Sequence, residues 1–162
     1  MRVLGLTVDM PNPGRPVVRA VVLEDALEAS HRPALTDVSL IDEFDLKTAE
    51  SAWARIAIQY FQDVSGRVST LAPDVVVVRR ADLFTKGRLG DGPRLRLVVE
   101  GAITAAAATH VASTHLRTGE ECARRCGMAK ATMDADGRSL VSTRTREEAA
   151  GAALCGLIGD RG

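Results

Sequence analysis

The chain has 162 residues, of which 46% are apolar, and its 21 basic and 21 acidic residues give a formal net charge of zero. This composition fits one folded domain over residues 1–162 and excludes a largely disordered chain. The neutral balance gives no global argument for a nucleic-acid partner, although a local basic face is compatible with it. Three cysteines build no disulfide framework, and we expect Cys122, Cys126 and Cys155 to be buried thiols.

The first part of the chain consists of apolar runs separated by turn residues. Segments 2–8 and 17–25 are rich in valine and leucine, and the Pro- and Gly-rich segment 10–16 lies between them. This pattern predicts a β-hairpin. The next segment, 26–47, is polar and irregular, and we expect only a short edge strand at 37–41 within it.

The middle of the chain changes its hydrophobic period. Apolar residues recur every three or four positions over 48–71, which predicts a long amphipathic helix. The unbroken β-branched run at 74–78 is typical of a strand that is buried on both faces. A glycine-rich loop at 83–93 then precedes an alanine-rich helix over 94–109.

The last part of the chain predicts one further strand and two further helices. A short strand at 110–115 is followed by a helix over 118–127. Segment 128–139 is predicted to be an exposed loop. Thr145 and Glu148 have the spacing of a capping box, which predicts the start of the last helix.

A hairpin meander followed by alternating helices and strands predicts an α/β fold, with a mixed sheet and helices on both faces. Five segments in this order carry a family likeness: VLGLT at 3–7, DVVVVRRAD at 74–82, LVVEGAITAAAATH at 97–110, RTGEECARRCG at 117–127 and EEAAGAALCGL at 147–157. Over nearly the whole chain they resemble the ribonuclease H-like fold, and more narrowly the RuvC-type Holliday-junction resolvases.

That resemblance implies where a catalytic site would lie. Enzymes of this family cleave phosphodiesters with two Mg²⁺ ions, which are held by four acidic residues on the first strand, the central strand and the last helix. The corresponding positions here are Thr7, Arg79, Glu148 and Gly151. Three of the four carry no carboxylate, and Arg79 is a cation that would oppose Mg²⁺ binding. The resemblance therefore implies a catalytically inactive RuvC-like domain, without a cofactor, that serves as a nucleic-acid-binding or assembly module.

Two alternatives stay open. The acids of a divergent Mg²⁺-dependent nuclease or resolvase could have moved, so that Asp9, Asp82 and Glu148 form the metal site. Asp9 lies on the same strand face as Thr7, since side chains alternate along a strand. Turn, loop and capping roles explain the three acids more simply. The third hypothesis is a scaffold of the same fold that binds no nucleic acid, which the zero net charge favours.

The predicted central strand and the loop after it carry the densest basic stretch of the chain. We expect five of its residues to contact the phosphates of DNA or RNA: Arg79, Arg80, Lys86, Arg88 and Arg94. Trp53 and Tyr60, on the predicted helix 48–71, belong to an apolar face that would permit a homodimer, although core packing accounts for it equally well. No apolar run reaches the ~20 residues that span a bilayer. The sequence begins without a signal-peptide pattern, so we expect a cytoplasmic protein that contacts no membrane.

Overall fold

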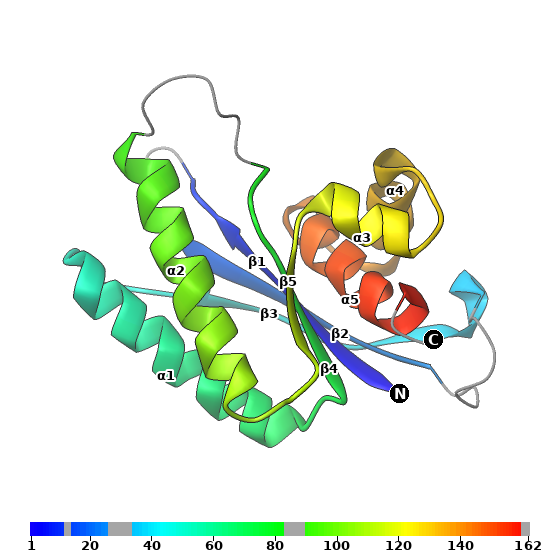
Figure 1. The fold of residues 1–162 in the computed structure, drawn as a ribbon, viewed down its shortest axis with the longest axis horizontal. Helices are drawn as coiled ribbons and strands as arrows, with labels where there is room; N and C mark the ends of the chain where they lie inside the picture. The colour runs from blue at the N-terminus through cyan, green and yellow to red at the C-terminus, as the bar shows by residue number, and fades with distance from the viewer. Residues whose placement is uncertain (12–13, 26–33, 83–89, 160–162) are drawn as a thin grey trace.

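A computed structural model describes the chain except for residues 12–13, 26–33, 83–89 and 160–162. The described residues form a mixed five-stranded sheet with helices on both faces (Figure 1), which confirms the predicted fold class. The strands lie in the order β3-β2-β1-β4-β5. Their bounds are Arg2–Asp9 for β1, Val17–Asp25 for β2, Val38–Lys47 for β3, Val75–Arg79 for β4 and Thr114–Arg117 for β5.

Strands β1 and β4 form the centre of the sheet. The first three strands make an antiparallel meander, whereas β4 runs parallel to β1 and β5 runs parallel to β4. All five residues of β4 and the middle six of β1 are buried, as expected for strands that are covered on both faces. The parallel pairing places the carboxyl ends of β1, β4 and β5 at one edge of the sheet.

Two helices cover one face of the sheet and three cover the other (Figure 1). Leu4 and Leu6 of β1 face the first pair, whereas Val3 of β1 and Val77 of β4 face the second group. The first pair is α1 (Trp53–Leu71) and α2 (Asp91–Ala108), and the second group is α3 (Gly119–Arg125), α4 (Lys130–Leu140) and α5 (Glu147–Gly159). Two short 3₁₀ turns, Leu35–Asp37 and Arg144–Arg146, precede β3 and α5.

Helix α5 lies unusually close to β1 because small residues meet at the contact. A Cβ atom added to Gly5 would lie 2.0 Å from the backbone oxygen of Ala149, and one added to Gly156 would lie 2.6 Å from Cγ1 of Val3. Any side chain at either position would push the helix away from the sheet. This close approach sets the first turn of α5 beside the end of β1.

Two predictions about local structure were wrong. Segment 128–139, expected to be an exposed loop, is largely helix α4, which packs on α5 through the buried Met133 and Gly137. Residues 42–47, expected to be irregular, belong to β3. The side chains of Glu43 and Asp45 on one face of β3 form ion pairs with Arg146, whereas Phe44 and Leu46 on the other face pack against the core.

Other elements exist as predicted but begin elsewhere. Helix α1 begins at Trp53 rather than at residue 48, and α2 begins at Asp91, inside the predicted glycine-rich loop. Strand β5 begins at Thr114 rather than at residue 110. None of the helices in the described ranges is long and apolar enough to cross a membrane.

Candidate functional site

The four positions implied by the resemblance meet at the carboxyl edge of the sheet. Thr7 near the end of β1 is in register with Arg79 at the end of β4. The Thr7 hydroxyl donates a hydrogen bond to Oε2 of Glu148 over 3.3 Å, although the two residues lie 141 positions apart in the chain. Gly151 lies one turn further along α5, where an added Cβ would be 3.4 Å from Nη1 of Arg79.

Arg79 lies at the centre of this cluster, and only 2% of its side chain is exposed. Its Nη1 atom donates to Oδ1 of Asp134 over 2.6 Å, and its Nη2 atom lies 3.8 Å from Oε1 of Glu148. Asp134 also accepts a hydrogen bond from Lys130 over 2.8 Å. A buried charge needs such compensation, because an unpaired guanidinium in the interior would cost several kcal/mol.

The charged states of Arg79 and Asp134 stabilise each other. Burial opposes the charge on Arg79, but Asp134 and Glu148 outweigh it and raise the pKa of the guanidinium. Burial likewise opposes the charge on Asp134, but hydrogen bonds from Arg79 and Lys130 outweigh it and lower the pKa of that carboxyl. The cluster is therefore a permanently charged ion-pair network at neutral pH.

Gly119 makes room for the guanidinium. A Cβ added to this glycine in α3 would lie 2.6 Å from Nη2 of Arg79 and 2.6 Å from Cε of Lys130. At Gly151 in α5 an added Cβ would only touch Arg79 at an ordinary van der Waals distance. A close approach that a side chain would obstruct is therefore found at Gly119.

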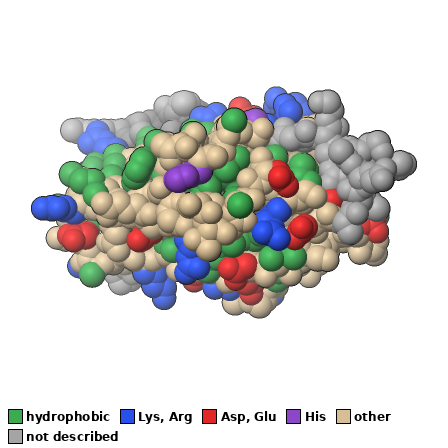
Figure 2. All heavy atoms as spheres, turned by 90° about the horizontal axis from the view of Figure 1, so that it is seen from below, with side chains coloured by type: hydrophobic (Ala, Val, Ile, Leu, Met, Phe, Trp, Pro, Cys, Tyr) green, Lys and Arg blue, Asp and Glu red, His purple; other side chains and the backbone are tan. Residues whose placement is uncertain are grey.

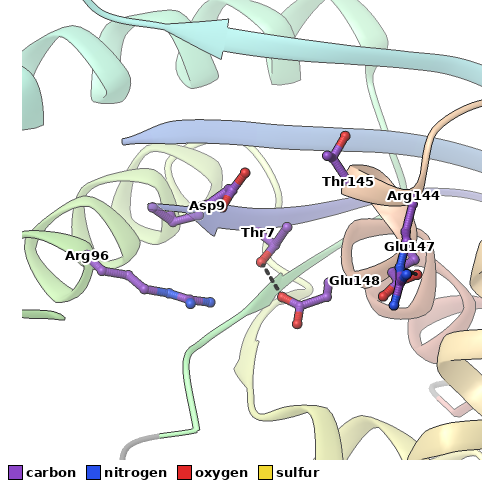
Figure 3. Close-up of a pocket in the computed structure, with 8 residues that line it drawn as sticks. Thr7, Asp9, Arg96, Arg144, Thr145, Glu147 and Glu148 are labelled. Carbon is purple, nitrogen blue, oxygen red and sulfur yellow. Dashed lines mark hydrogen bonds and ion pairs between the residues drawn. The ribbon is translucent and has the colours of Figure 1, made fainter. Parts of the chain in front are cut away.

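A hollow of about 400 Å³ opens above the Thr7–Glu148 hydrogen bond (Figure 3). We call it the Thr7 hollow. Arg96 of α2 reaches toward it from one side, and the residues at the start of α5 close the other side (Figure 3). Its walls are formed by Thr7, Val8, Asp9, Arg96, Arg144, Thr145, Glu147 and Glu148.

Asp9, the acid that could have replaced a missing ligand, is engaged elsewhere. One of its carboxylate oxygens accepts a hydrogen bond from Arg19 over 2.8 Å. Arg19 also donates to Asp45 over 2.6 Å, and Asp45 accepts from Arg146 over 3.0 Å. Asp9 therefore ends a chain of ion pairs that ties β1, β2 and β3 to the turn before α5.

Among the described residues, Asp9, Asp82 and Glu148 are not brought together as a group that could hold a metal ion. Asp82 is exposed beyond the end of β4, and the described residues contain no group of three His, Cys, Asp or Glu side chains that could hold a metal ion. Around Glu148 the other donors are the hydroxyl of Thr7 and the guanidinium of Arg79. Hard divalent cations need several carboxylate or carbonyl oxygens, so the residues present do not fit Mg²⁺.

The predicted capping role of Glu148 was wrong. The turn Arg144–Arg146 leads directly into α5, and the hydroxyl of Thr145 pairs with that of Thr143 over 3.1 Å. The Glu148 side chain instead points toward Thr7 and Arg79. The capping box that the sequence predicts for Thr118 and Glu121, at the start of α3, is confirmed.

The predicted phosphate-binding residues have different environments. Arg79 is buried in its ion pairs, so its guanidinium does not face solvent. Arg80 is partly exposed, with its Nη2 atom 3.6 Å from Oε1 of Glu121, and Arg94 is exposed on α2. Lys86 and Arg88 lie outside the described residues.

The sequence did not predict that Asp134 and Lys130 pair beside Arg79, nor that Glu100 holds Arg96 at the Thr7 hollow. Asp134 lies in the segment that was predicted to be a loop. Lys130 precedes Asp134 by four positions, and Arg96 likewise precedes Glu100, to which it donates over 2.7 Å. This i,i+4 spacing of opposite charges is itself a helix signal, and it could have identified α4. The expected burial of all three cysteines is confirmed.

No known family model matches the chain, and no curated protein matches it in sequence. Solved structures do match. RuvC from Thermus thermophilus is similar with a TM-score of 0.72 at 13% identity, covering 99% of this chain and 96% of that protein. T. thermophilus RuvC in complex with a Holliday junction substrate gives 0.68 at 13% identity, with coverage of 99% and 96%. The yeast mitochondrial Holliday junction resolvase Ydc2 gives 0.57 at 10% identity, with coverage of 98% and 77%.

The sheet order, the two helical layers and these matches define the chain as a protein with a ribonuclease H-like fold. Within that class the fold is of the RuvC type, and it extends over nearly the whole length of the chain. Identities of 10% and 13% establish the fold alone. The function has to be argued from the residues of the site.

Proposed function

We propose that the chain is a RuvC-like domain that binds nucleic acid and does not cleave it by metal-ion chemistry. The observation that carries this proposal is the buried guanidinium of Arg79, which pairs with Asp134 and lies 3.8 Å from Glu148. It fills the position where the resolvase resemblance expects a metal-binding carboxylate. A fixed internal cation neutralises the remaining acids and repels a divalent cation from the same place.

The nucleic-acid part of the proposal rests on the fold and on exposed cations. The chain shares its fold with a RuvC whose structure contains a Holliday junction substrate. Two arginines at the carboxyl edge of the sheet reach solvent: Arg80 is partly exposed and Arg94 is exposed. Guanidinium groups match phosphate oxygens with paired hydrogen bonds.

One experiment tests both parts together. Labelled duplex and four-way-junction oligonucleotides are incubated with the protein at low salt, with EDTA, Mg²⁺ or Mn²⁺, and are followed by fluorescence anisotropy and by denaturing gels. We expect salt-dependent binding and intact strands under all three conditions. Metal-dependent cleavage that Glu148→Gln or Asp9→Asn abolishes would establish the divergent nuclease instead.

The divergent nuclease is kept as the second candidate because Asp9, Glu147 and Glu148 line the same hollow. A loss of the Asp9–Arg19 ion pair would be required before Asp9 could turn toward Glu148. The scaffold hypothesis predicts a third result, which is no binding of any oligonucleotide even at low salt.

A homodimer is a further part of the proposal, but not through the predicted face of α1, because Tyr60 is buried in the core. Ile58 and Phe61 of α1 are 50% and 36% exposed, and Leu97 and Val98 of α2 are 36% and 39% exposed. These side chains lie on the helical layer formed by α1 and α2, where Ile58 and Phe61 line a shallow apolar hollow with Ala102. Light scattering after size exclusion should give twice the monomer mass, and Ile58→Glu with Phe61→Glu should restore the monomer.

A further inference from the structure

A second arginine lies beside Arg79 at this edge of the sheet. Strand β5 places Arg117 in register beside Arg79, so the two arginines lie on neighbouring strands and face the same side of the sheet. Arg117 is 9% exposed, and its Nη1 atom donates to the sulfur of Cys155 over 3.3 Å. The two arginines share this side of the sheet but have different partners: Arg79 pairs with Asp134 and Glu148, and Arg117 donates to Cys155.

A second hollow, of about 330 Å³, opens beside Arg117 between β5 and α3. We call it the Arg117 hollow. Arg117 belongs to its inner wall, and the exposed Arg124 and Arg125 lie at its rim in the last turn of α3. Its lining consists of Leu116, Arg117, Glu121, Arg124 and Arg125.

The two hollows differ in the sign of their charge. The Arg117 hollow is lined by three arginines and one carboxylate, and that carboxylate, Glu121, is itself 3.6 Å from Arg80. The Thr7 hollow is lined by two arginines and three carboxylates. A phosphodiester backbone is therefore attracted to the Arg117 hollow and finds no net attraction at the Thr7 hollow.

We propose that the Arg117 hollow, with Arg80, Arg124 and Arg125 at its rim, is the surface that binds the phosphate backbone of a nucleic acid. The inference rests on the proposed function and gives it a location: the contact lies along β5 and α3, beside the Thr7 hollow rather than over it. Cations at the end of a helix also suit the helix dipole. The dipole explains Arg124 and Arg125, but it does not explain a buried arginine on the adjacent strand.

This surface fits a phosphate backbone more than a base-reading contact. Arg80, Arg124 and Arg125 present forked donors that match phosphate oxygens, whereas the hollow offers no aromatic side chain on which a base could stack. The expected binding is insensitive to sequence and strongly dependent on salt.

The test compares two double variants of the full chain that change its charge equally. Arg124→Glu with Arg125→Glu reverses the rim of the hollow. Arg15→Glu with Arg55→Glu reverses two exposed arginines, one before β2 and one on α1. Binding to a labelled duplex and to a four-way junction, in DNA and in RNA form, is measured by anisotropy over a series of salt concentrations.

We expect the rim variant to bind at least about tenfold more weakly and to lose about two from the slope of log affinity against log salt, as the loss of two phosphate contacts predicts. The control variant should stay within about twofold of the wild type, since a uniform change of net charge acts only weakly at physiological ionic strength. Circular dichroism checks the fold, and the milder Arg124→Ala with Arg125→Ala variant replaces the reversal if it unfolds.

Three other results would overturn the surface assignment, the proposed function or both. If the wild type binds nucleic acid and both double variants weaken it equally, the surface assignment is wrong while the proposed function survives. If the wild type binds no nucleic acid, both fall. If a polyglutamate peptide competes as well as the oligonucleotide, the surface serves an acidic protein, and the nucleic-acid assignment is overturned.

Discussion

At the scale of single residues, the molecule depends most on Arg79. Its guanidinium is compensated by Asp134 and Glu148, so removal of the side chain leaves carboxylates facing a cavity. Loss of one partner of a buried ion pair costs about 3–5 kcal/mol. We therefore expect Arg79→Met to lower the free energy of unfolding by that amount in urea titrations near neutral pH. Arg79→Lys should recover only part, because an ammonium group lacks the planar fork.

The pH dependence of this loss follows from Asp134. Its pKa in the folded chain lies below the ordinary value of 3.8, so its contribution is present above that value and is lost as the pH falls through the folded pKa. The difference between wild type and Arg79→Met should therefore shrink in strongly acidic urea titrations. Arg144→Met, whose side chain is 85% exposed, is the control and should change stability by less than about 0.5 kcal/mol. An equal loss in both variants would contradict the buried-pair account.

Tyr60 offers a spectroscopic test of the core between the sheet and helices α1 and α2. It is the single tyrosine of the chain, it is fully buried, and its hydroxyl donates to the backbone oxygen of Pro16. Burial, with a smaller effect of Asp63, raises the pKa of its phenol from 10.0 to about 12. Ultraviolet absorbance of the phenolate should titrate near 12 in the folded chain and near the ordinary value in urea.

The raised pKa of Tyr60 determines how the stability of the folded chain changes with pH. The folded chain keeps the phenolic proton that the unfolded chain releases, so stability is fully present below pH 10 and falls as the pH rises toward 12. Tyr60→Phe should remove the absorbance change completely. A midpoint near 10 in the folded protein would show that this phenol is not buried as described.

At the scale of elements, the sequence predicts those whose hydrophobic period is strong. Helix α1 buries Ile56, Tyr60, Val64 and Val68 at spacings of four, and β4 begins with four consecutive valines. Helix α4 could not be predicted in this way, because Met133 and Gly137 are its buried residues and most of the others are polar or small. Residues 42–47 of β3 could not be predicted as a strand for a related reason. Their charged side chains are paired with arginines from other segments of the chain.

The residues around Arg79 could likewise be predicted only in part from the sequence. The convergence of Thr7, Arg79 and Glu148 follows from the resemblance, and the structure brings these residues together. Asp134 could not be assigned as the partner of Arg79, because it lies 55 residues away on a helix without a strong hydrophobic period. Pairing between distant charges is decided by the packing of α4 on α5, which has no local signature.

The contact of α4 with α5 gives a prediction at this scale. A Cβ added to Gly137 would lie 2.7 Å from the backbone oxygen of Glu147 and 2.9 Å from the backbone nitrogen of Gly151. Glycine to alanine in a helix usually stabilises by about 0.5–1 kcal/mol. For Gly137→Ala we expect the reverse, a loss of about 1–3 kcal/mol from overpacking against backbone, measured by urea or thermal unfolding.

The matched control for Gly137→Ala is an alanine substitution of Gly101 in α2. Gly101 is also inside a helix, but an added Cβ there meets no atom within 4 Å. Gly101→Ala should therefore show the ordinary gain of up to about 1 kcal/mol. If both alanine variants gain stability, then α4 does not pack on α5 as closely as the structure has it.

At the scale of the whole molecule, neutrality is achieved by mixing charges rather than by omitting them. Basic and acidic side chains are interspersed over the face shown in Figure 2, and the chain as a whole has 21 of each sign. Such a surface steers a polyanion weakly at long range, so recognition depends on local groups such as the Arg117 hollow.

The fold also brings together the four positions at which the resemblance implies metal ligands. Thr7, Arg79, Glu148 and Gly151 come from two parallel strands and a helix that crosses them, and the close contact of Gly5 with α5 holds this geometry. This geometry does not depend on Arg79 itself. We therefore predict that Thr7→Asp, Arg79→Glu and Gly151→Asp together, with the native Glu148, create a site for divalent cations. Space for the new aspartate at 151 appears once the guanidinium, 3.4 Å from an added Cβ there, is removed.

Without metal, the triple variant should be less stable than the wild type, because like charges gather where an ion pair stood. Mn²⁺ should restore stability by about 2.7 kcal/mol at a hundred times its Kd, and calorimetric titration should detect the binding directly. The wild type should show neither effect. The control is Thr7→Asn, Arg79→Gln and Gly151→Asn, which has nearly the same shape without the added carboxylates and should bind no Mn²⁺. A folded triple variant that ignores Mn²⁺ would mean that the four positions do not converge closely enough to hold an ion, and the comparison between Arg79 and a metal ligand would lose its basis.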